Sequence, residues 1–410
     1  MPDSLTFALL SNAISGTGAA LRSITRLQPV GGVGDRVFPA TFKDGIYAVE
    51  KRRVPVDGAT KEVECVLLNS NPSEANHAEL ALLEAVRRNR IQLPLIEIDF
   101  QAANSSLLKP LQNLTSLEVP HRLADAIIRD SNLPDGTRFS KSEYAAGWRA
   151  ANLWNATPVY DLCPTALVFG MWGSPEKPGG LGAKFERAFI SEIVGVDLDP
   201  VGILDKTGQK VIARRPGFRI DPLNSSSEVP VAKTEGGFEV LKEVRKGSLK
   251  PSQLNHGNIL IESPNCGVRF QYAEQTTVIS LGALRKLNFP IDKNATPDID
   301  DAARTVLAAI GLCAAVLASE RGTSLRSRCH LFPEQERTWE LIDTPGATPV
   351  SYSISGDQAT EILNDAVKKA EALGLKWRNE KLVLTPASEL IALARRSQEI
   401  AATKDSAEGE

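Results

Sequence analysis

The sequence predicts an α+β fold, in which strands and helices intermix without the steady βαβ alternation of a doubly wound sheet. Two kinds of pattern carry this prediction. Segments rich in Val, Ile, Thr and aromatic residues predict strands at 19–30, 45–56, 62–69, 266–281 and 338–342. Apolar residues at helical spacing predict helices at 73–90, 300–319, 357–373 and 386–402. The sequence contains no repeat at a fixed period.

Local signals refine these elements. Asp57-Gly58 indicates a hairpin between the second and third strands, with a loop longer than two residues. Residues 93–100 (LPLIEIDF) alternate apolar and acidic side chains, which is typical of a half-buried strand. Residues 163–172 (CPTALVFGMW) also predict a strand, whereas 131–164 and 200–235 are expected to be irregular.

Composition narrows the class of protein. The chain has 410 residues, 24% of them charged, and a net charge of −3, as in an ordinary globular protein. Its five cysteines are dispersed without a CxxC pair, which favours reduced thiols. The apolar run at 306–318 is too short to span a bilayer and predicts a buried helix. With no basic region before the first apolar residues, we expect no secretory signal, no membrane contact and a cytoplasmic location.

Residues 114–131 (LTSLEVPHRLADAIIRDS) predict a helix that begins near Leu117 or Glu118, because Pro120 fits only in a first turn. Glu118 and Arg122, and likewise Asp125 and Arg129, are acid-first pairs spaced i,i+4. Two interpretations stay open. The helix presents a salt-bridged solvent face, or its residues His121 and Arg122 contact RNA.

A glycine-rich loop at 178–182 precedes a second predicted helix. Lys184, Arg187 and Ser191 would lie on one stripe of that helix, whose amino-terminal N–H groups would offer an anion site. Phe185 follows the lysine where a nucleotide-triphosphatase loop needs Ser or Thr, which argues against that class of enzyme. The alternative is a glycine-rich turn before a packed helix.

Other cations are scattered. Residues 205–250 hold ten Lys or Arg against six Asp or Glu and include Arg214 and Arg215. Arg326 and Arg328 follow a predicted helix end. For each of these groups two interpretations stay open: its side chains bind phosphates, or they are solvated surface residues. The four histidines are too dispersed for a metal site, so we expect no metal, no cofactor and no catalytic residue.

Six segments, in the same order along the chain, resemble one known family. That family is the CRISPR-associated RAMP proteins that form the backbone subunit of type I-U (I-G) Cascade effector complexes. The segments are LLNSNPSEANHAELALLEAV (67–86), LTSLEVPHRLADAIIRDS (114–131), PTALVFGMWGS (164–174), GGLGAKFERAFISEIVG (179–195), YAEQTTVISLGALRKLNFP (272–290) and LRSRCHL (325–331). The resemblance covers most of residues 65–331, and the first 60 and last 70 residues add little to it.

The resemblance implies an RNA-recognition-like (ferredoxin-like) core with large insertions. That core would comprise 1–200 and 260–345, with a basic, possibly thumb-like, insertion at 201–259 and a helical extension at 346–410 that ends in a disordered acidic tail. It also implies a non-catalytic subunit that binds guide RNA, target DNA through that guide, further copies of itself head to tail, and other effector subunits. Within the matching segments, the expected RNA contacts are Asn76, His121, Arg122, Lys184, Arg187, Arg285, Lys286, Arg326 and Arg328, to which the basic insertion adds Arg214 and Arg215.

A second function is weighed against the first. A RAMP-type endoribonuclease that processes the guide precursor would use His121 as its acid–base group, because histidine titrates near neutral pH.

Overall fold

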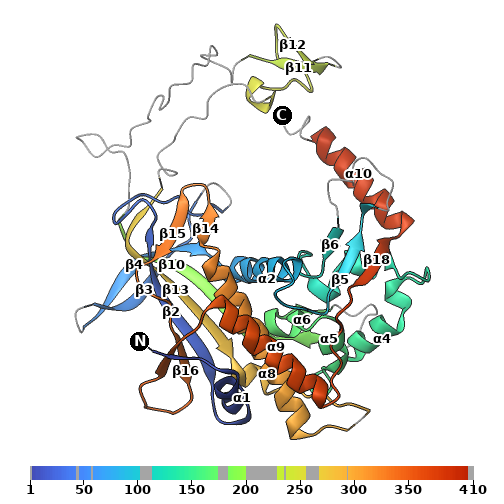
Figure 1. Ribbon diagram of the computed structural model, residues 1–410. Coiled ribbons are helices and arrows are strands. Elements are labelled where there is room, and N and C mark those ends of the chain that lie inside the picture. Colours follow the sequence, from blue (N-terminus) through green and yellow to red (C-terminus); the bar gives the residue numbers. More distant parts are fainter. Residues whose placement is uncertain are drawn as a thin grey trace.

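The computed structural model describes residues 2–42, 46–56, 59–101, 113–173, 183–199, 229–234, 237–254, 267–292 and 294–404. Within these residues the chain is a mixed α+β protein (Figure 1), which confirms the predicted class. The glycine-rich loop, Arg214, Arg215 and the end of the acidic tail lie outside the described residues.

A large antiparallel sheet organises the fold. Its main path runs β1-β17-β16-β2-β13-β10-β4-β3, and a hairpin of β14 and β15 is attached to β2. The only parallel pair among these described strands is β1 with β17. The bounds are β1 Asp3–Ser4, β2 Ala20–Pro29, β3 Val49–Val56, β4 Ala59–Asn69, β10 Phe189–Asp199, β13 Arg269–Ser280, β14 Thr323–Arg326, β15 Cys329–Pro333, β16 Trp339–Ile342 and β17 Val350–Ser353.

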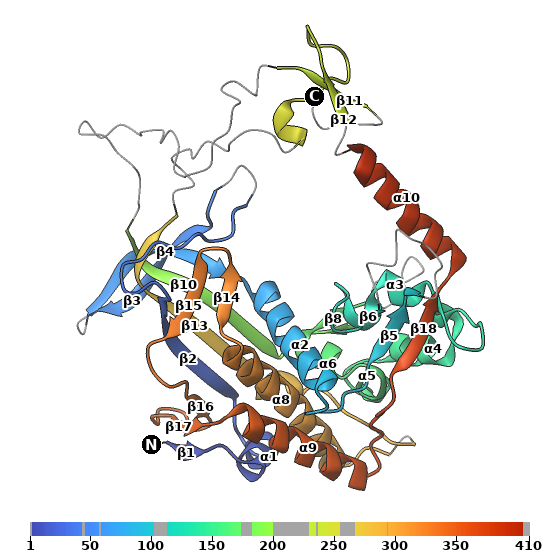
Figure 2. The same cartoon turned by 45° about the horizontal axis from the view of Figure 1, so that its top comes forward.

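At the centre of this sheet are four mutually antiparallel strands in the order β16-β2-β13-β10. Along the chain, helix α2 (Asn71–Arg87) lies between β2 and β10, and helix α8 (Pro297–Glu320) lies between β13 and β16. Helix α2 packs on β10 and α8 packs on β13. The helices α1 (Phe7–Ser15) and α9 (Gly356–Ala372) pack against α8. Figures 1 and 2 show α2 and α8 between the large sheet and a smaller one.

The smaller sheet has the order β6-β5-β18-β7 and joins segments far apart in the sequence. Its strands are β5 (Ile96–Asp99), β6 (Asn113–Thr115), β7 (Ser131–Asn132) and β18 (Leu382–Pro386). The strand β18 pairs in parallel with β5 and antiparallel with β7. The C-terminal segment is therefore built into the body: it supplies the two predicted helices, α9 and α10 (Ser388–Lys404), and two strands that the sequence did not reveal.

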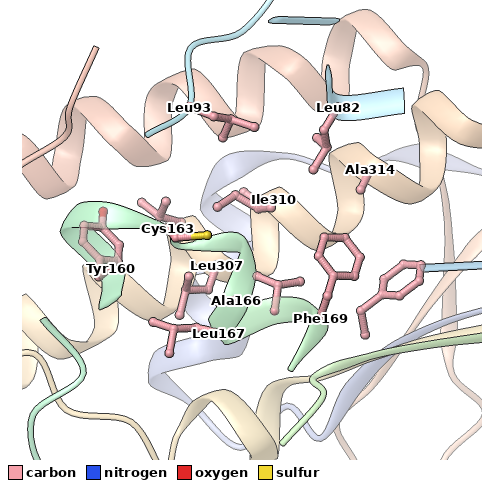
Figure 3. Packing of buried hydrophobic residues seen from close by; sticks show 14 of the residues in the cluster. Leu82, Leu93, Tyr160, Cys163, Ala166, Leu167, Phe169, Leu307, Ile310 and Ala314 are labelled. Atoms are coloured by element: carbon pink, nitrogen blue, oxygen red, sulfur yellow. The ribbon is translucent and has the colours of Figure 1, made fainter. Parts of the chain in front are cut away.

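Short helices fill the space beside the small sheet. They are α3 (Ala126–Arg129), α4 (Glu143–Ala150), α5 (Thr157–Leu162) and α6 (Thr165–Phe169). The expectation that 131–164 is irregular was wrong, because it contains α4 and α5. The strand predicted at 163–172 was wrong for residues 165–169, which form α6, and right only at Met171–Trp172, which is the strand β8. None of these four helices is longer than eight residues, so the apolar period of each is too brief to separate from a strand pattern. Figure 3 shows Tyr160, Ala166, Leu167 and Phe169 packed against Leu307, Ile310 and Ala314 of α8 and Leu82 of α2.

The prediction for 306–318 is confirmed. Helix α8 is the one described helix long and apolar enough to cross a membrane, and 83% of its most apolar window is buried inside the protein. Its amino terminus is capped by the Thr296 side chain, which accepts a hydrogen bond from the Ile299 N–H. The helix is thus the apolar centre of a folded core.

The hairpin of β3 and β4 is confirmed, but β4 begins at Ala59, three residues before the predicted strand, and β3 begins only at Val49. They pair up to Val56 and Ala59, so the expectation of a loop longer than two residues was wrong. Within the basic insertion, β11 (Val231–Thr234) and β12 (Gly237–Val240) form a two-stranded antiparallel sheet of their own.

Candidate nucleic-acid interface

A basic groove lies between the residues that follow Leu117 and a small β-ribbon. It encloses about 610 Å³, and its walls are residues 120–129, the end of α4, and the ribbon of β8 (Met171–Trp172) and β9 (Lys184–Phe185) with the two residues after it. Six of the lining residues are cations or histidine: His121, Arg122, Arg129, Arg149, Lys184 and Arg187. The single described carboxylate in the lining is Glu186, which pairs with Lys286 at 2.5 Å.

The first wall is not the predicted helix. After Leu117 the chain makes a turn and a 3-10 segment, Arg122–Ala124, before the four-residue helix α3. Arg122 has a φ of 50°, which no continuous α-helix permits. The buried carboxylate of Asp125 accepts hydrogen bonds from the N–H groups of Ile127 (2.8 Å) and His121 (3.0 Å), so this residue begins α3. The prediction of one helix over 118–130 was wrong. Asp125 lies in the middle of this range and caps the amino terminus of a separate helix, α3.

Neither predicted i,i+4 ion pair forms. Arg122 instead binds Glu79 of α2 with two hydrogen bonds, Nε to Oε1 at 2.6 Å and NH2 to Oε2 at 2.7 Å, and donates to the Gly170 carbonyl at 3.1 Å. The Arg122 and Glu79 side chains are only 11% and 4% exposed. Burial raises the pKa of Glu79, and the hydrogen bonds from Arg122 partly offset that rise. Arg122 thus links the base of the groove to α2 and to Gly170, and its guanidinium is already hydrogen-bonded to Glu79 and the Gly170 carbonyl.

The second wall is a β-ribbon, not the predicted helix. Trp172 pairs with Lys184, and Met171 pairs with Phe185. Met171 and Phe185 are buried, whereas Trp172 and Lys184 on the opposite face are exposed. The Lys184 ammonium lies 5.3 Å from the centroid of the Trp172 ring. Lys184 therefore reaches the groove as a strand residue, without the helix amino terminus that was expected beside it.

The strand β10 explains why the helical interpretation failed. Ser191, expected on an exposed basic stripe, is buried beneath α2, where its hydroxyl donates to Glu74 at 2.8 Å and shares a 2.9 Å hydrogen bond with Thr277. Ile190 faces solvent instead. Because Ser191 is buried and Ile190 exposed, while both faces are buried from Ile193 to Val196, the sequence of β10 gives no period-two signal.

Several of the predicted RNA-contact residues come together in this region. A second cleft of about 400 Å³ adjoins the groove, shares Pro120, Arg122 and Arg187 with it, and adds Asn76 of α2. Asn76, His121, Lys184 and Arg187 are exposed. Within the described part of the chain, neither Lys184 nor Arg187 has an ion-pair partner within 4.0 Å. These four side chains are accessible to a ligand along one continuous surface.

The remaining predicted residues lie elsewhere. Arg285 donates to the Ala13 and Ile14 carbonyls at 2.7 and 3.0 Å and closes the end of α1. Arg326 donates to the Pro39 carbonyl at 2.9 Å, and Arg328 lies 4.6 Å from the centroid of the Phe38 ring. The latter two belong to the β14–β15 hairpin, away from the groove. Lys286 touches the groove only through Glu186.

Sequence reasoning missed three residues of the groove: Arg129, Arg149 and Trp172. Arg149 donates to the Ser140 carbonyl at 2.8 Å, and its guanidinium lies 5.8 Å from the centroid of the Trp148 ring. Arg129 pairs with Asp130 at 2.7 Å. The signal for Trp172 was present, because a strand that buries Met171 must turn its neighbour outward.

Comparison with known protein families adds an independent observation. Residues 21–200, which include every residue of the groove, match the family described as CRISPR-associated protein GSU0053. The chain is similar to a CRISPR-associated protein. No curated protein matches the chain. The match begins upstream of the resembling segments, so the strand β2 and the hairpin β3–β4 also lie within the residues that are similar to this family.

Proposed function

We propose that this CRISPR-associated protein is a non-catalytic subunit that grips the phosphate backbone of a guide RNA in the groove between residues 120–129 and the β8–β9 ribbon. The observation that carries the proposal is the charge of that groove: six basic or histidine side chains line it with one carboxylate, in a protein whose net charge is −3. Arg122 and Arg129 are bound by Glu79 and Asp130, so the proposal depends chiefly on His121, Lys184 and Arg187. Such local clustering attracts phosphates whatever the overall balance. The groove offers several cations and few hydrogen-bonding side chains for bases, which favours binding independent of sequence.

The topology of the large sheet supports the proposed RNA-recognition-like core. A ferredoxin-like unit has the chain order βαββαβ and the sheet order 4-1-3-2. Here the strands β2, β10, β13 and β16 follow one another in the chain with α2 and α8 in the two helical positions, and they lie in the order β16-β2-β13-β10. The hairpin β3–β4 and residues 88–188 are then insertions between the first strand and the second.

The same proposal extends to partners. The subunit would assemble head to tail with copies of itself along the guide, beside other CRISPR effector subunits in the cytoplasm, and would meet target DNA through base pairing with the guide. The hairpin β11–β12, inside the basic insertion, is the candidate for a thumb-like element.

Measuring RNA binding as a function of salt tests the groove. Replacing both Lys184 and Arg187 by Glu should weaken binding at least about tenfold near 100 mM salt and reduce the salt slope by about two. Lys368→Glu on α9, an exposed cation paired with Asp365 at 3.4 Å, is the matched control and should leave affinity unchanged. Unchanged affinity of the double variant would remove the groove from the RNA path.

A further control separates the groove from the open face of the large sheet. Arg26 is exposed on that face, above the Tyr272 ring at 4.3 Å. If Arg26→Glu abolished binding while the groove variant did not, the RNA would lie on the sheet.

Sequencing the RNA that copurifies with the wild-type protein should give repeat-derived guides.

The endoribonuclease alternative is tested in the same preparation, because His121 is exposed at the groove. Labelled repeat RNA should remain intact with the wild-type protein. Cleavage at a fixed position that is lost in His121→Ala would overturn the non-catalytic assignment and favour the enzyme.

A further inference from the structure

Trp172 is an exposed aromatic ring set among the cations of the groove. It is 70% exposed although it belongs to a ribbon whose other face is buried. We propose that Trp172 stacks against an unpaired base of the nucleic acid whose phosphates the groove binds. This inference rests on the proposed function and adds to it a base contact that phosphate binding alone does not require.

The ribbon holds the ring in place. Met171 and Phe185, which pair across the two strands, are buried in the core and anchor one face. Next to the tryptophan, a Cβ built on Gly173 would come within 2.6 Å of the Trp148 ring, so the backbone at the end of β8 lies directly on that side chain. Strand geometry then directs Trp172 away from the core. The indole is therefore presented on a supported backbone and is not a loose surface side chain.

The surroundings of the ring match what single strands need. A base stacks on an aromatic side chain only when it is unpaired and accessible, and the adjoining phosphates need cations nearby. The Lys184 ammonium lies 5.3 Å from the centroid of the indole, and Arg129, Arg149 and Arg187 line the same groove. The ring and the cations together would accept one base and its flanking phosphates.

A second exposed tryptophan provides the control. The chain has five tryptophans, and Trp154 is 77% exposed but lines a different cleft. The other three are at most 7% exposed. In a Trp154→Phe background, Trp172 is thus the one accessible indole, and its fluorescence reports contact with a base.

The experiment compares a fluorescein-labelled oligoadenylate RNA, the same strand with abasic sites, and its duplex with oligouridylate. Trp172→Ala should weaken binding of the oligoadenylate roughly tenfold, and Trp154→Ala should not change it. The wild-type protein should bind the abasic strand about as weakly as Trp172→Ala binds the oligoadenylate. With unlabelled RNA, indole emission in the Trp154→Phe background should be quenched by the oligoadenylate and not by the abasic strand. The duplex should not quench it.

Equal affinity of the wild-type protein and Trp172→Ala for oligoadenylate would overturn the stacking proposal, as would quenching by the abasic strand. Thermal melting and the conservative Trp172→Phe variant, which keeps an aromatic ring and should retain most of the affinity, distinguish lost stacking from misfolding. If the Lys184 and Arg187 charge reversal abolishes binding while Trp172→Ala does not, stacking fails and the phosphate groove stands. If the wild-type protein binds none of these RNAs, the proposed function itself fails.

Discussion

The buried ion pair between Arg122 and Glu79 gives the sharpest test of how the groove is built. Replacing Arg122 by Ala would leave the Glu79 carboxylate, 4% exposed, without its two hydrogen bonds and would also free the Gly170 carbonyl. Removing one partner of a buried ion pair costs about 3–5 kcal/mol. Since domains are typically stable by only about 5–15 kcal/mol, the variant should unfold at a clearly lower denaturant concentration.

The defect should depend on pH. Burial already raises the pKa of Glu79 above its ordinary value, and loss of Arg122 removes the interaction that opposes this rise. When folding raises the pKa of a carboxyl group, its protonated form stabilises the folded state. This stabilisation is complete at pH values below the pKa of the unfolded state, and it is lost as the pH rises through the pKa of the folded state. The destabilisation of Arg122→Ala should therefore be larger at about pH 8 than at about pH 5, where Glu79 takes up a proton more readily.

Urea denaturation followed by circular dichroism measures both effects. Arg187→Ala is the matched control, because Arg187 lines the same groove but is exposed; its unfolding free energy should stay within about 0.5 kcal/mol of the wild type. The double variant Arg122→Met with Glu79→Gln removes both charges and should recover much of the loss. A wild-type denaturation curve for Arg122→Ala, or an equal deficit at both pH values, would refute the reasoning.

Three further outcomes follow from other buried groups. Burial raises the pKa of Asp161 to about 6, so ionised Asp161 opposes folding. Asp161→Asn should therefore stabilise the protein by up to about 2 kcal/mol at about pH 8 and by less at about pH 4. An effect on the unfolding free energy that does not depend on pH would contradict this. Gly195→Ala should destabilise the fold by about 1–3 kcal/mol, because a Cβ there would come within 2.6 Å of the Phe270 ring; an unchanged thermal midpoint would show that the ring moves freely. Arg285→Ala frees carbonyl groups at the end of α1 and should lower the melting temperature without changing RNA affinity, whereas weaker binding by a fully folded variant would return Arg285 to the interface.

The long elements were predictable because each repeats its pattern over many residues. Helix α8, strands β2 and β13, and helix α9 were predicted close to their observed bounds, since several turns or alternations of apolar residues report one buried face. The hairpin of β3 and β4 was predicted from a local turn signal between two strand patterns, although its loop is shorter than expected.

The groove depended on contacts that sequence spacing does not reveal. Lys184, Arg187 and Ser191 have helical spacing, yet Ser191 is buried because Glu74 and Thr277 satisfy its hydroxyl. Arg122 sits four residues from Glu118 but binds Glu79, which is 43 residues away. In both cases, hydrogen bonds to residues far away in the sequence stabilise the observed structure more than the local side-chain spacing would stabilise a helix.

By itself the sequence determined an α+β fold, the long helices and strands, and a set of basic residues that includes His121, Lys184 and Arg187. Only the tertiary structure decided which of those residues share a surface. Turns at Arg122 and Asp125, together with a ribbon that buries Met171 and Phe185, bring separate short segments to one groove. Short elements carry too little local free energy to fix their own form, so packing against the core selects it.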